Sequence, residues 1–267
     1  MKAMILAAGL GTRLRPLTAE RPKALVEVGN RTMLEITLSR LRDFGIEDVI
    51  INVHHFAGMV VDYLKANDNF GMQIEVSRED VLLDTGGGLK KAAQFFLRDS
   101  GSLAEPFILH NVDVLSTVDL RRMAQFHTAN QALATLAVQG RKTSRYLLFD
   151  EALQLRGRRS GLDQQSEAAH ASSPTSLPTS PPMQALAFAG IHVISPRLLT
   201  MMSEDGAFSI IDSYLRLAAQ GEKICGFRAD EYYWRDLGRL DDVMQAAQDL
   251  KERDVKKKDL KEKVSLR

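Results

Sequence analysis

Short apolar runs alternate along this chain with amphipathic segments of helical period. An apolar run over residues 3–6 is followed by a helical pattern over 33–44 and then by a β-branched run over 49–53. Further strands are predicted at 73–76, 107–109, 134–138, 185–193 and 223–227, and further helices at 59–66, 89–97, 120–127, 210–219 and 241–252. This alternation predicts an α/β fold with a Rossmann-like, mostly parallel, twisted sheet and helices on both of its faces. Ligands of such sheets bind beyond the carboxyl ends of the strands, so chemistry is expected in the loops that leave them.

Two segments depart from this pattern. Residues 157–184 hold half of the chain's eight prolines, many serines and threonines, and almost no large apolar side chain. Such a segment cannot bury enough surface to offset its ordering entropy, so we expect a flexible insertion there. Residues 251–267 mix lysines with acids and lack an apolar face, which predicts a charged helical tail. The rest of residues 1–250 is expected to form a single domain.

The composition excludes several classes of partner and site. The 267 residues carry 35 basic and 34 acidic side chains, so no global field favours nucleic acid or an anionic membrane surface. No stretch approaches the roughly 20 apolar residues of a membrane span. Cys225 is the only cysteine, which excludes an internal disulfide or a cysteine-based zinc site and suits a reducing cytoplasm. The oligomeric state stays open, and a homo-oligomer is compatible with the sequence.

The first predicted strand leads into a loop of glycines and basic side chains. The loop has the sequence GLGTRLRP at residues 9–16, and RPK follows at residues 21–23. Glycines let backbone N–H groups approach an anion, while Thr12, Arg13 and Lys23 add a hydroxyl group and two positive charges. No Gly-Lys-Ser/Thr closes the loop, as a Walker A loop requires, and Leu14 replaces the third glycine of the dinucleotide fingerprint. We therefore expect a different kind of triphosphate-binding loop.

This loop is one of a series of motifs. They read LAAGLGTRLRPLT at 6–18, RPKAL at 21–25, LDTGGG at 83–88, NVD at 111–113, FAGI at 188–191 and YWRDLG at 233–238. Together they resemble the signature of the sugar-1-phosphate nucleotidyltransferases, over nearly everything except the insertion and the tail. The resemblance is greatest to the bacterial N-acetylmuramic acid 1-phosphate uridylyltransferases, followed by the guanylyltransferases for mannose or heptose 1-phosphate. It implies that a nucleoside triphosphate and a sugar 1-phosphate are joined with release of pyrophosphate.

The resemblance also implies a role for individual residues. Nucleotide contacts are implied for Ala7, Ala8, Gly9, Gly11, Thr12, Arg13, Lys23, Glu79, Gly86 and Gly87. The implied catalytic residues are Arg13, Lys23 and Asp113, and the implied Mg²⁺ ligands are Asp113 and Asp236. Contacts to the acceptor sugar phosphate are implied for Asn111, Arg145 and Gly190. The residue chemistry agrees, because Mg²⁺ is commonly held by one or two carboxylates together with substrate phosphates.

Several residues leave alternatives open. Glu79 could accept hydrogen bonds from uracil or from guanine, so it does not choose the base. Val112 replaces a glycine of the family beside Asp113, and a β-branched residue there could alter acceptor affinity or metal placement. Histidines are expected to pack or to lie in turns rather than bind metal, because no metal-like spacing joins His54, His55, His110 and His192.

Two other classes of protein remain as alternatives. The segment Asn111-Val112-Asp113 also resembles the acidic metal motif of nucleotide-sugar glycosyltransferases, whose sheet is similar. Such an enzyme starts from a diphosphate sugar and has no obvious need of a triphosphate loop with Arg13 and Lys23. The replacement at Val112 suggests instead a regulatory protein that binds nucleotide sugars. The intact basic residues and both aspartates favour a Mg²⁺-dependent nucleotidyltransferase over either alternative.

Overall fold

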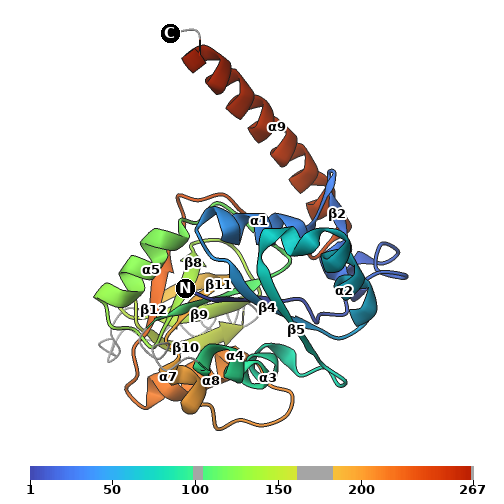
Figure 1. The fold of residues 1–267 in the computed structure, drawn as a ribbon. Coiled ribbons are helices and arrows are strands. Elements are labelled where there is room, and N and C mark those ends of the chain that lie inside the picture. The colour runs from blue at the N-terminus through green and yellow to red at the C-terminus, as the bar shows by residue number, and fades with distance from the viewer. Residues whose placement is uncertain (99–104, 161–182, 266–267) are drawn as a thin grey trace. The chain divides into compact units, whose positions relative to one another are not determined.

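The computed structural model describes residues 1–98, 105–160 and 183–265 (Figure 1). The chain divides into two compact units, which we call the first unit and the second unit. The first unit comprises Met1–Met4, Leu83–His110 and Val118–Tyr232, and the second comprises Ile5–Leu82, Asn111–Thr117 and Tyr233–Arg267. The single domain expected over residues 1–250 stays a prediction. None of the helices in the described ranges is long and apolar enough to cross a membrane.

The first unit is built on a mixed sheet. Its strands are β6 (Phe107–Asn111), β8 (Ala134–Gln139), β9 (Arg145–Phe149), β10 (Leu155–Ser160), β11 (Gln184–Ile194) and β12 (Ile224–Arg228). β11 pairs antiparallel with β6, β8 and β9, while β10 pairs antiparallel with β9 and β12 pairs parallel with β8. The helices are α3 (Asp84–Lys91), α4 (Ala93–Leu97), α5 (Leu120–Ala129), α7 (Arg197–Thr200) and α8 (Ile210–Ala219). Figure 1 shows α3, α4 and α8 together, and α3 packs against α8.

The second unit contains parallel strands and two small two-stranded sheets. β4 (Asp48–Val53) and β5 (Gln73–Arg78) pair in parallel, and β1 (Ala3–Leu6), which runs from the first unit into the second, is the neighbour of β4 in the strand order. The small sheets pair β2 (Glu27–Val28) with β3 (Arg31–Thr32), and β7 (Val114–Ser116) with β13 (Trp234–Asp236). The helices are α1 (Met33–Asp43), α2 (Ala57–Ala66), α9 (Leu240–Ser265) and the 3₁₀ turns η1 (Thr12–Leu14), η2 (Lys23–Leu25) and η3 (Asp68–Gly71).

The elements predicted from periodicity are found, and the α/β class is confirmed. The predicted helix at 89–97 is two helices, α3 and α4, which meet at Ala92. The charged tail predicted for 251–267 belongs to α9, a continuous helix as far as Ser265. The structure adds β9, β10, α7 and both small sheets. β10 is rich in arginine, and α7 and the strands of the small sheets are very short, so none of these carries a clear apolar pattern. β9 has the sequence RYLLF and was missed despite its apolar residues.

The ends of the predicted insertion at 157–184 are strand rather than loop. Residues 157–160 belong to β10 and Gln184 begins β11. Arg158 pairs with Leu147 of β9, and its guanidinium forms an ion pair with Asp212 at 2.7 Å. Ladder hydrogen bonds and this ion pair order a segment that the apolar pattern does not mark. The remainder of the predicted insertion, residues 161–182, lies outside the described residues.

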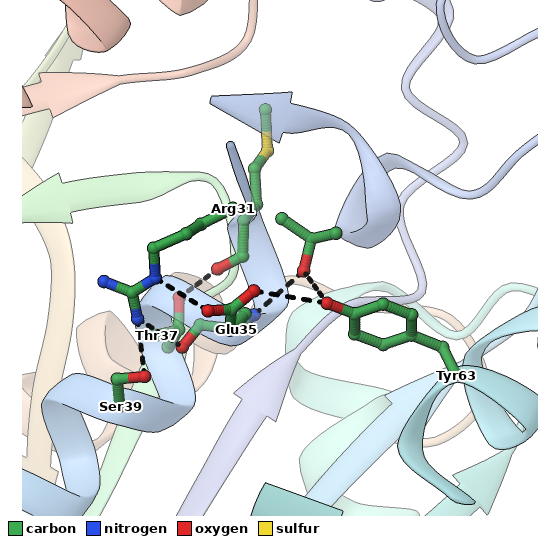
Figure 2. A network of polar contacts seen from close by, with 7 residues as sticks. Arg31, Glu35, Thr37, Ser39 and Tyr63 are labelled. Carbon is green, nitrogen blue, oxygen red and sulfur yellow. Dashed lines mark hydrogen bonds and ion pairs between the residues drawn. The ribbon is translucent and has the colours of Figure 1, made fainter. Parts of the chain in front are cut away.

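The start of α1 is fixed by the N-cap residue Thr32, and Figure 2 shows the polar network around Arg31, Glu35 and Tyr63 at this end of the helix. The Thr32 hydroxyl accepts from the Glu35 N–H at 3.1 Å, which satisfies a backbone donor that the first helical turn leaves unpaired. The Glu35 carboxylate accepts from Arg31 Nε at 2.8 Å and from the Tyr63 hydroxyl of α2 at 3.3 Å. Arg31 also donates to the Ser39 hydroxyl at 2.6 Å. Glu35 therefore links the cap of α1 to its second turn and to α2.

Two histidines are buried in the neutral form in the first unit. His127 of α5 lies 3.0 Å from the hydroxyls of both Thr135 and Ser195, and burial lowers its pKa to about 4. His192 of β11 lies 2.9 Å from the Tyr214 hydroxyl. Burial, followed by the nearby charge of His110, lowers the pKa of His192 to about 3. The prediction that His110 and His192 pack in the core is confirmed.

Candidate active site

The loop after β1 turns tightly at Gly11. Gly11 has a φ of 63°, and its carbonyl accepts from the Leu14 N–H at 2.9 Å and from the Thr18 hydroxyl at 2.8 Å. A β-carbon on Gly11 would lie 3.0 Å from Thr18 Cγ2 and 3.1 Å from Lys23 Cβ. Backbone conformation and space therefore both require glycine. The loop then exposes Thr12 and Arg13 on η1.

Lys23 and Asp113 form an ion pair within the second unit. Lys23 begins η2 and is buried, and its Nζ donates to Asp113 Oδ2. The two side chains are only 10% and 20% exposed. A buried ammonium group is costly without a partner, so this carboxylate accounts for the charge of Lys23 in the fold.

The small sheet of β7 and β13 brings a second aspartate beside Asp113. Asp113 precedes β7, and Asp236 is the last residue of β13, where it pairs with Val114. The Leu237 N–H then donates to the Asp113 carbonyl at 2.8 Å. The ladder thus fixes the two aspartate backbones next to each other, although they come from distant parts of the chain.

Charges of both signs surround the Asp236 carboxylate. Burial raises the pKa of Asp236, and the negative charge of Asp113 raises it further. The Gly238 N–H, which donates to Asp236 at 2.6 Å, acts in the opposite direction, as do the charges of Lys23 and Arg13. Arg13, Lys23, Asp113 and Asp236, which the sequence predicted as one site, therefore lie together in the second unit.

Gly238 belongs to this cluster, although it was not among the predicted site residues. A β-carbon on Gly238 would lie 2.8 Å from Arg13 Nη2 and would collide with the Asp236 carboxylate. The absence of a side chain therefore lets an arginine and a carboxylate approach the same backbone position. The signal was present in the sequence, because Gly238 closes the motif at 233–238.

A buried hydrogen-bonded chain joins Glu79 to the loop after β1. Asn52 of β4 donates to Glu79 Oε1 at 2.7 Å and accepts from the Ala7 N–H at 2.7 Å. His54 Nδ1 lies 2.8 Å from the Glu79 carbonyl oxygen. Asn52 was missed in the sequence, although an amide within the apolar run at 49–53 is an unusual residue. The structure thus connects two predicted nucleotide contacts, Ala7 and Glu79, through Asn52.

Gly86 and Gly87 lie in the first unit and are tightly packed there. The Phe208 carbonyl accepts from the Gly86 N–H at 2.9 Å and from the Gly87 N–H at 3.4 Å. A β-carbon on Gly86 would collide with the Phe208 ring, and one on Gly87 would collide with the Gly206 carbonyl. Packing of α3 against the segment before α8 therefore explains why both positions are glycine. Their contact with a nucleotide stays a prediction.

Arg145 and Gly190, the predicted acceptor contacts of the first unit, lie on β9 and β11. Gly190 has a φ of 75° and stands where the register of β11 against β8 shifts between Phe188 and His192. This bulge explains the glycine, because few other residues adopt that conformation. Arg145 begins β9 and is exposed. A role for either residue in binding the acceptor stays a prediction.

The remaining predicted residues lie near the ends of β1 and β6. Ala7 and Ala8 are buried after β1, whereas Gly9 is exposed with open space around its α-carbon. Asn111 ends β6, and the following Val112 N–H donates to the Leu6 carbonyl at 3.1 Å. Val112 is only 4% exposed. Its side chain therefore fills buried space beside Asp113.

The two aspartates suit a hard divalent cation. Burial and then the negative charge of Asp113 raise the pKa of Asp236, and a cation held between the two carboxylates would relieve their repulsion. In the described part of the chain, no group of three or more histidine, cysteine, aspartate and glutamate side chains could hold a metal ion. Two carboxylates without further protein ligands match Mg²⁺, which usually keeps water and takes substrate phosphates as ligands.

Comparison with known proteins points to one family. The family described as nucleotidyl transferase matches residues 2–151. N-acetylmuramate alpha-1-phosphate uridylyltransferase of Caulobacter vibrioides is 34% identical over 88% of this chain and 91% of its own length. UTP–glucose-1-phosphate uridylyltransferase of Synechocystis is 26% identical over 96% of this chain and 65% of its own length. Mannose-1-phosphate guanyltransferase of Yarrowia lipolytica is 36% identical over 55% of this chain and 40% of its own length.

Solved structures share the fold at lower sequence identity. A UDP-glucose pyrophosphorylase complexed with UDP-glucose superposes with a TM-score of 0.73 at 18% identity, covering 94% of this chain and 98% of that one. HddC from Yersinia pseudotuberculosis, complexed with GMP-PN, gives a TM-score of 0.67 at 19% identity over 93% and 99% of the two chains. From the matching family and the relative in Caulobacter, this chain belongs to the nucleotidyl transferase family, within the sugar-1-phosphate nucleotidyltransferases.

Proposed function

We propose that this enzyme transfers the uridylyl group of UTP to N-acetylmuramic acid 1-phosphate with the help of Mg²⁺ and releases pyrophosphate. The observation that carries the proposal is the cluster of Arg13, Lys23, Asp113 and Asp236, in which two cationic and two anionic groups face one another. Such a cluster suits a reaction between two polyanions, because it offers positive charge to phosphates and carboxylates to a metal ion.

The reaction needs positioning more than acid–base catalysis. A phosphate monoester loses its second proton at a pKa of about 6, so the sugar 1-phosphate is already largely a dianion near neutral pH. One of its oxygens forms a bond to the α-phosphorus of the triphosphate. The bond from that phosphorus to the bridging oxygen breaks, and its electron pair leaves with pyrophosphate. The nucleotide sugar and pyrophosphate account for every atom of the two substrates.

Four residues of the second unit would then stabilise the charges of the substrates and of the leaving group. Arg13 and Lys23 would neutralise the triphosphate and the charge that grows on the leaving pyrophosphate. Lys23 would exchange its present partner, Asp113, for phosphate oxygens when the substrate binds. Asp113 and Asp236 would hold Mg²⁺, which supplies Lewis-acid stabilisation of the phosphoryl oxygens when bound. The N–H groups around Gly9 and Gly11 would complete the contacts to the triphosphate.

The choice of base and sugar rests on the relatives, and two side chains are compatible with it. The uridylyltransferase of Caulobacter aligns with this chain over nearly the full length of both, which favours uracil and an acidic amino sugar. Glu79, oriented by Asn52, would accept from the N3–H of uracil. The exposed Arg145 would pair with the phosphate or with the carboxylate that N-acetylmuramic acid carries.

A guanylyltransferase for mannose or heptose 1-phosphate is the second candidate. The mannose-1-phosphate guanyltransferase of Yarrowia is 36% identical to this chain, although the match spans only 148 residues. The carboxylate of Glu79 would also accept from the two adjacent donors of guanine, so this residue leaves both bases open.

A matrix of triphosphates against sugar 1-phosphates, followed by pyrophosphate release, tests the proposal. We expect the highest kcat/KM for UTP with N-acetylmuramic acid 1-phosphate and a strict requirement for Mg²⁺. Asp113→Asn and Asp236→Asn each remove a proposed metal ligand and should lower turnover by several orders of magnitude while the fold stays intact. Asp113→Asn should also lower the melting temperature, because it leaves the buried ammonium group of Lys23 without its charged partner. A preference for GTP with mannose or heptose 1-phosphate would establish the second candidate. No pyrophosphate release from any pair would favour a protein that only binds nucleotide sugars.

A further inference from the structure

Different side chains stand on the two faces of β13, the strand that carries Asp236. Successive side chains of a strand point to opposite faces, so Trp234 and Asp236 share one face of β13 and Arg235 stands on the other. The hydroxyl of Tyr233, the residue before the strand, accepts from Arg235 Nε at 3.1 Å. β13 is a three-residue strand that pairs with the three residues of β7, with one backbone hydrogen bond beyond each end of the ladder. A ladder this short is weak by itself, so the position of Asp236 depends on what holds the opposite face.

Helix α9 holds that opposite face through one carboxylate. Asp249 Oδ2 accepts from the Tyr233 hydroxyl at 2.5 Å and from Arg235 Nη2 at 3.0 Å. The hydrogen bond from Tyr233 is the largest cause of the lowered pKa of Asp249, with burial acting against it and Gln245 and Arg235 lowering it further. Asp249 is therefore ionised near neutral pH. It ties Arg235 of β13 and the preceding Tyr233 to a single point on the helix.

The helix itself is anchored in the second unit. Val243 and Ala246 of α9 are buried, and Asp249 follows Ala246 by three residues, so these positions lie on one face of the helix. Because α9 packs against β13 and β2, Asp249 is a fixed point rather than a mobile side chain. Asp242 of the same helix serves for comparison with Asp249. Its Oδ1 lies 3.9 Å from Arg235 Nη1, which is too far for a hydrogen bond.

We propose that Asp249 is a positioning residue for the metal site, which holds β13 against α9 so that the Asp236 carboxylate stands beside Asp113. This inference rests on the proposed function, because it concerns Asp236 as a metal ligand. Loss of Asp249 removes the contacts that tie Tyr233 and Arg235 to α9, and β13 is then held by its short ladder with β7 and by the backbone hydrogen bonds that flank it. The first consequence is weaker metal binding rather than loss of the fold.

Metal binding can be measured without catalysis, because Trp234 is the only tryptophan of the chain and lies two residues before Asp236. Mn²⁺ is paramagnetic and quenches nearby indole emission, so a titration with Mn²⁺ reports binding directly. Inorganic pyrophosphate is added at constant concentration, since it is released from every nucleoside triphosphate and does not depend on the base. The variants are Asp249→Ala and Asp249→Asn, with Asp242→Ala as the matched control on the same helix.

We expect Asp249→Ala to raise the half-saturating Mn²⁺ concentration about tenfold, at the lower end of what loss of support behind a metal ligand costs. Asp249→Asn should show a smaller shift because the amide still accepts one hydrogen bond, and Asp242→Ala should match the wild type. Tyr233→Phe removes only the hydroxyl and serves if Asp249→Ala does not fold. If Asp249→Asn and Tyr233→Phe both bind Mn²⁺ as tightly as the wild type, whether or not their melting temperatures fall, the positioning role of Asp249 is refuted while the metal site stands. Absence of saturable quenching in the wild type overturns the metal site and the inference together.

Discussion

Gly238 shows how one missing side chain shapes the charge cluster. Its N–H holds the Asp236 carboxylate, and a β-carbon would collide with that carboxylate and lie 2.8 Å from Arg13 Nη2. We predict that Gly238→Ala displaces both side chains and lowers kcat/KM about 10²-fold, the usual cost of a misplacement of roughly 1 Å at a reacting centre.

Gly58→Ala is the matched control for that variant. Gly58 lies within α2 and has open space around its α-carbon. Alanine there should leave the kinetics unchanged and raise the free energy of unfolding by roughly 0.5–1 kcal/mol. If Gly238→Ala keeps wild-type kcat/KM, then Arg13 and Asp236 tolerate other positions and the geometry of the cluster is less strict than described.

Val112 affects stability more directly than substrate choice. Its side chain is 4% exposed, so Val112→Gly removes a buried apolar group, worth about 1.5–3 kcal/mol, and adds roughly 0.5–1 kcal/mol of backbone entropy. We predict a loss of unfolding free energy of that combined size, measured by urea titration. Val112→Ala keeps the β-carbon and should lose less. A Val112→Gly protein as stable as the wild type would mean that the side chain fills no necessary space.

At the scale of elements, Glu35 links helices α1 and α2. It is the third helical residue of α1, its N–H donates to the N-cap hydroxyl of Thr32, and its carboxylate accepts from Arg31 and from Tyr63 (Figure 2). We predict that Glu35→Ala lowers the free energy of unfolding by about 1–2 kcal/mol, because it removes an ion pair and a hydrogen bond and leaves the Tyr63 hydroxyl without this acceptor. Asp43→Ala, at the exposed end of the same helix, should cost far less. Equal effects of the two substitutions in urea would show that the network adds no stability.

Elements were predictable where the signal is local. The helical period over 33–44 and the apolar runs at 3–6 and 49–53 each lie within one segment, and the structure contains α1, β1 and β4 there. The pairing of β7 with β13 was not predictable, because each strand has three residues and its partner lies in a distant segment. The site followed the same rule. Arg13, Lys23, Asp113 and Asp236 were found through motifs. Gly238 closes one of these motifs but was not singled out, and the contacts of Asn52 and Asp249 exist only in the fold.

At the scale of the whole molecule, buried histidines make stability depend on pH. The pKa of His127 is about 4 and that of His192 is about 3 in the folded protein, against an ordinary value of 6.5. Below pH 6.5 the unfolded chain therefore binds protons that the folded chain does not. Stability contributed by the neutral histidines is complete above about pH 6.5 and falls, by about 1.4 kcal/mol per pH unit for each histidine, as the pH decreases. Glu204, whose pKa is lowered to about 2 chiefly by a hydrogen bond from Arg216, adds to the loss only below about pH 4.5.

Urea unfolding at pH 7, 6 and 5 measures this dependence. We predict that His127→Gln and His192→Gln each reduce the slope of unfolding free energy against pH between pH 6 and 5, even if they lower stability at pH 7. His55→Gln, at an exposed position, is the control and should leave the slope unchanged. An unaltered slope in both core variants would assign the pH dependence to other groups.

The pairing of β7 with β13 also has a consequence for how the enzyme is made. A ribosome releases the chain from its first residue to its last, so Asp113 emerges long before Asp236 and α9. The second unit stays incomplete until its last segment, which begins at Tyr233, has left the exit tunnel. Lys23 and Asp113 can pair in the nascent chain, but the two carboxylates cannot. We therefore expect no partial activity from a chain that stops before Tyr233, because it lacks Asp236 and the strand that places this residue beside Asp113.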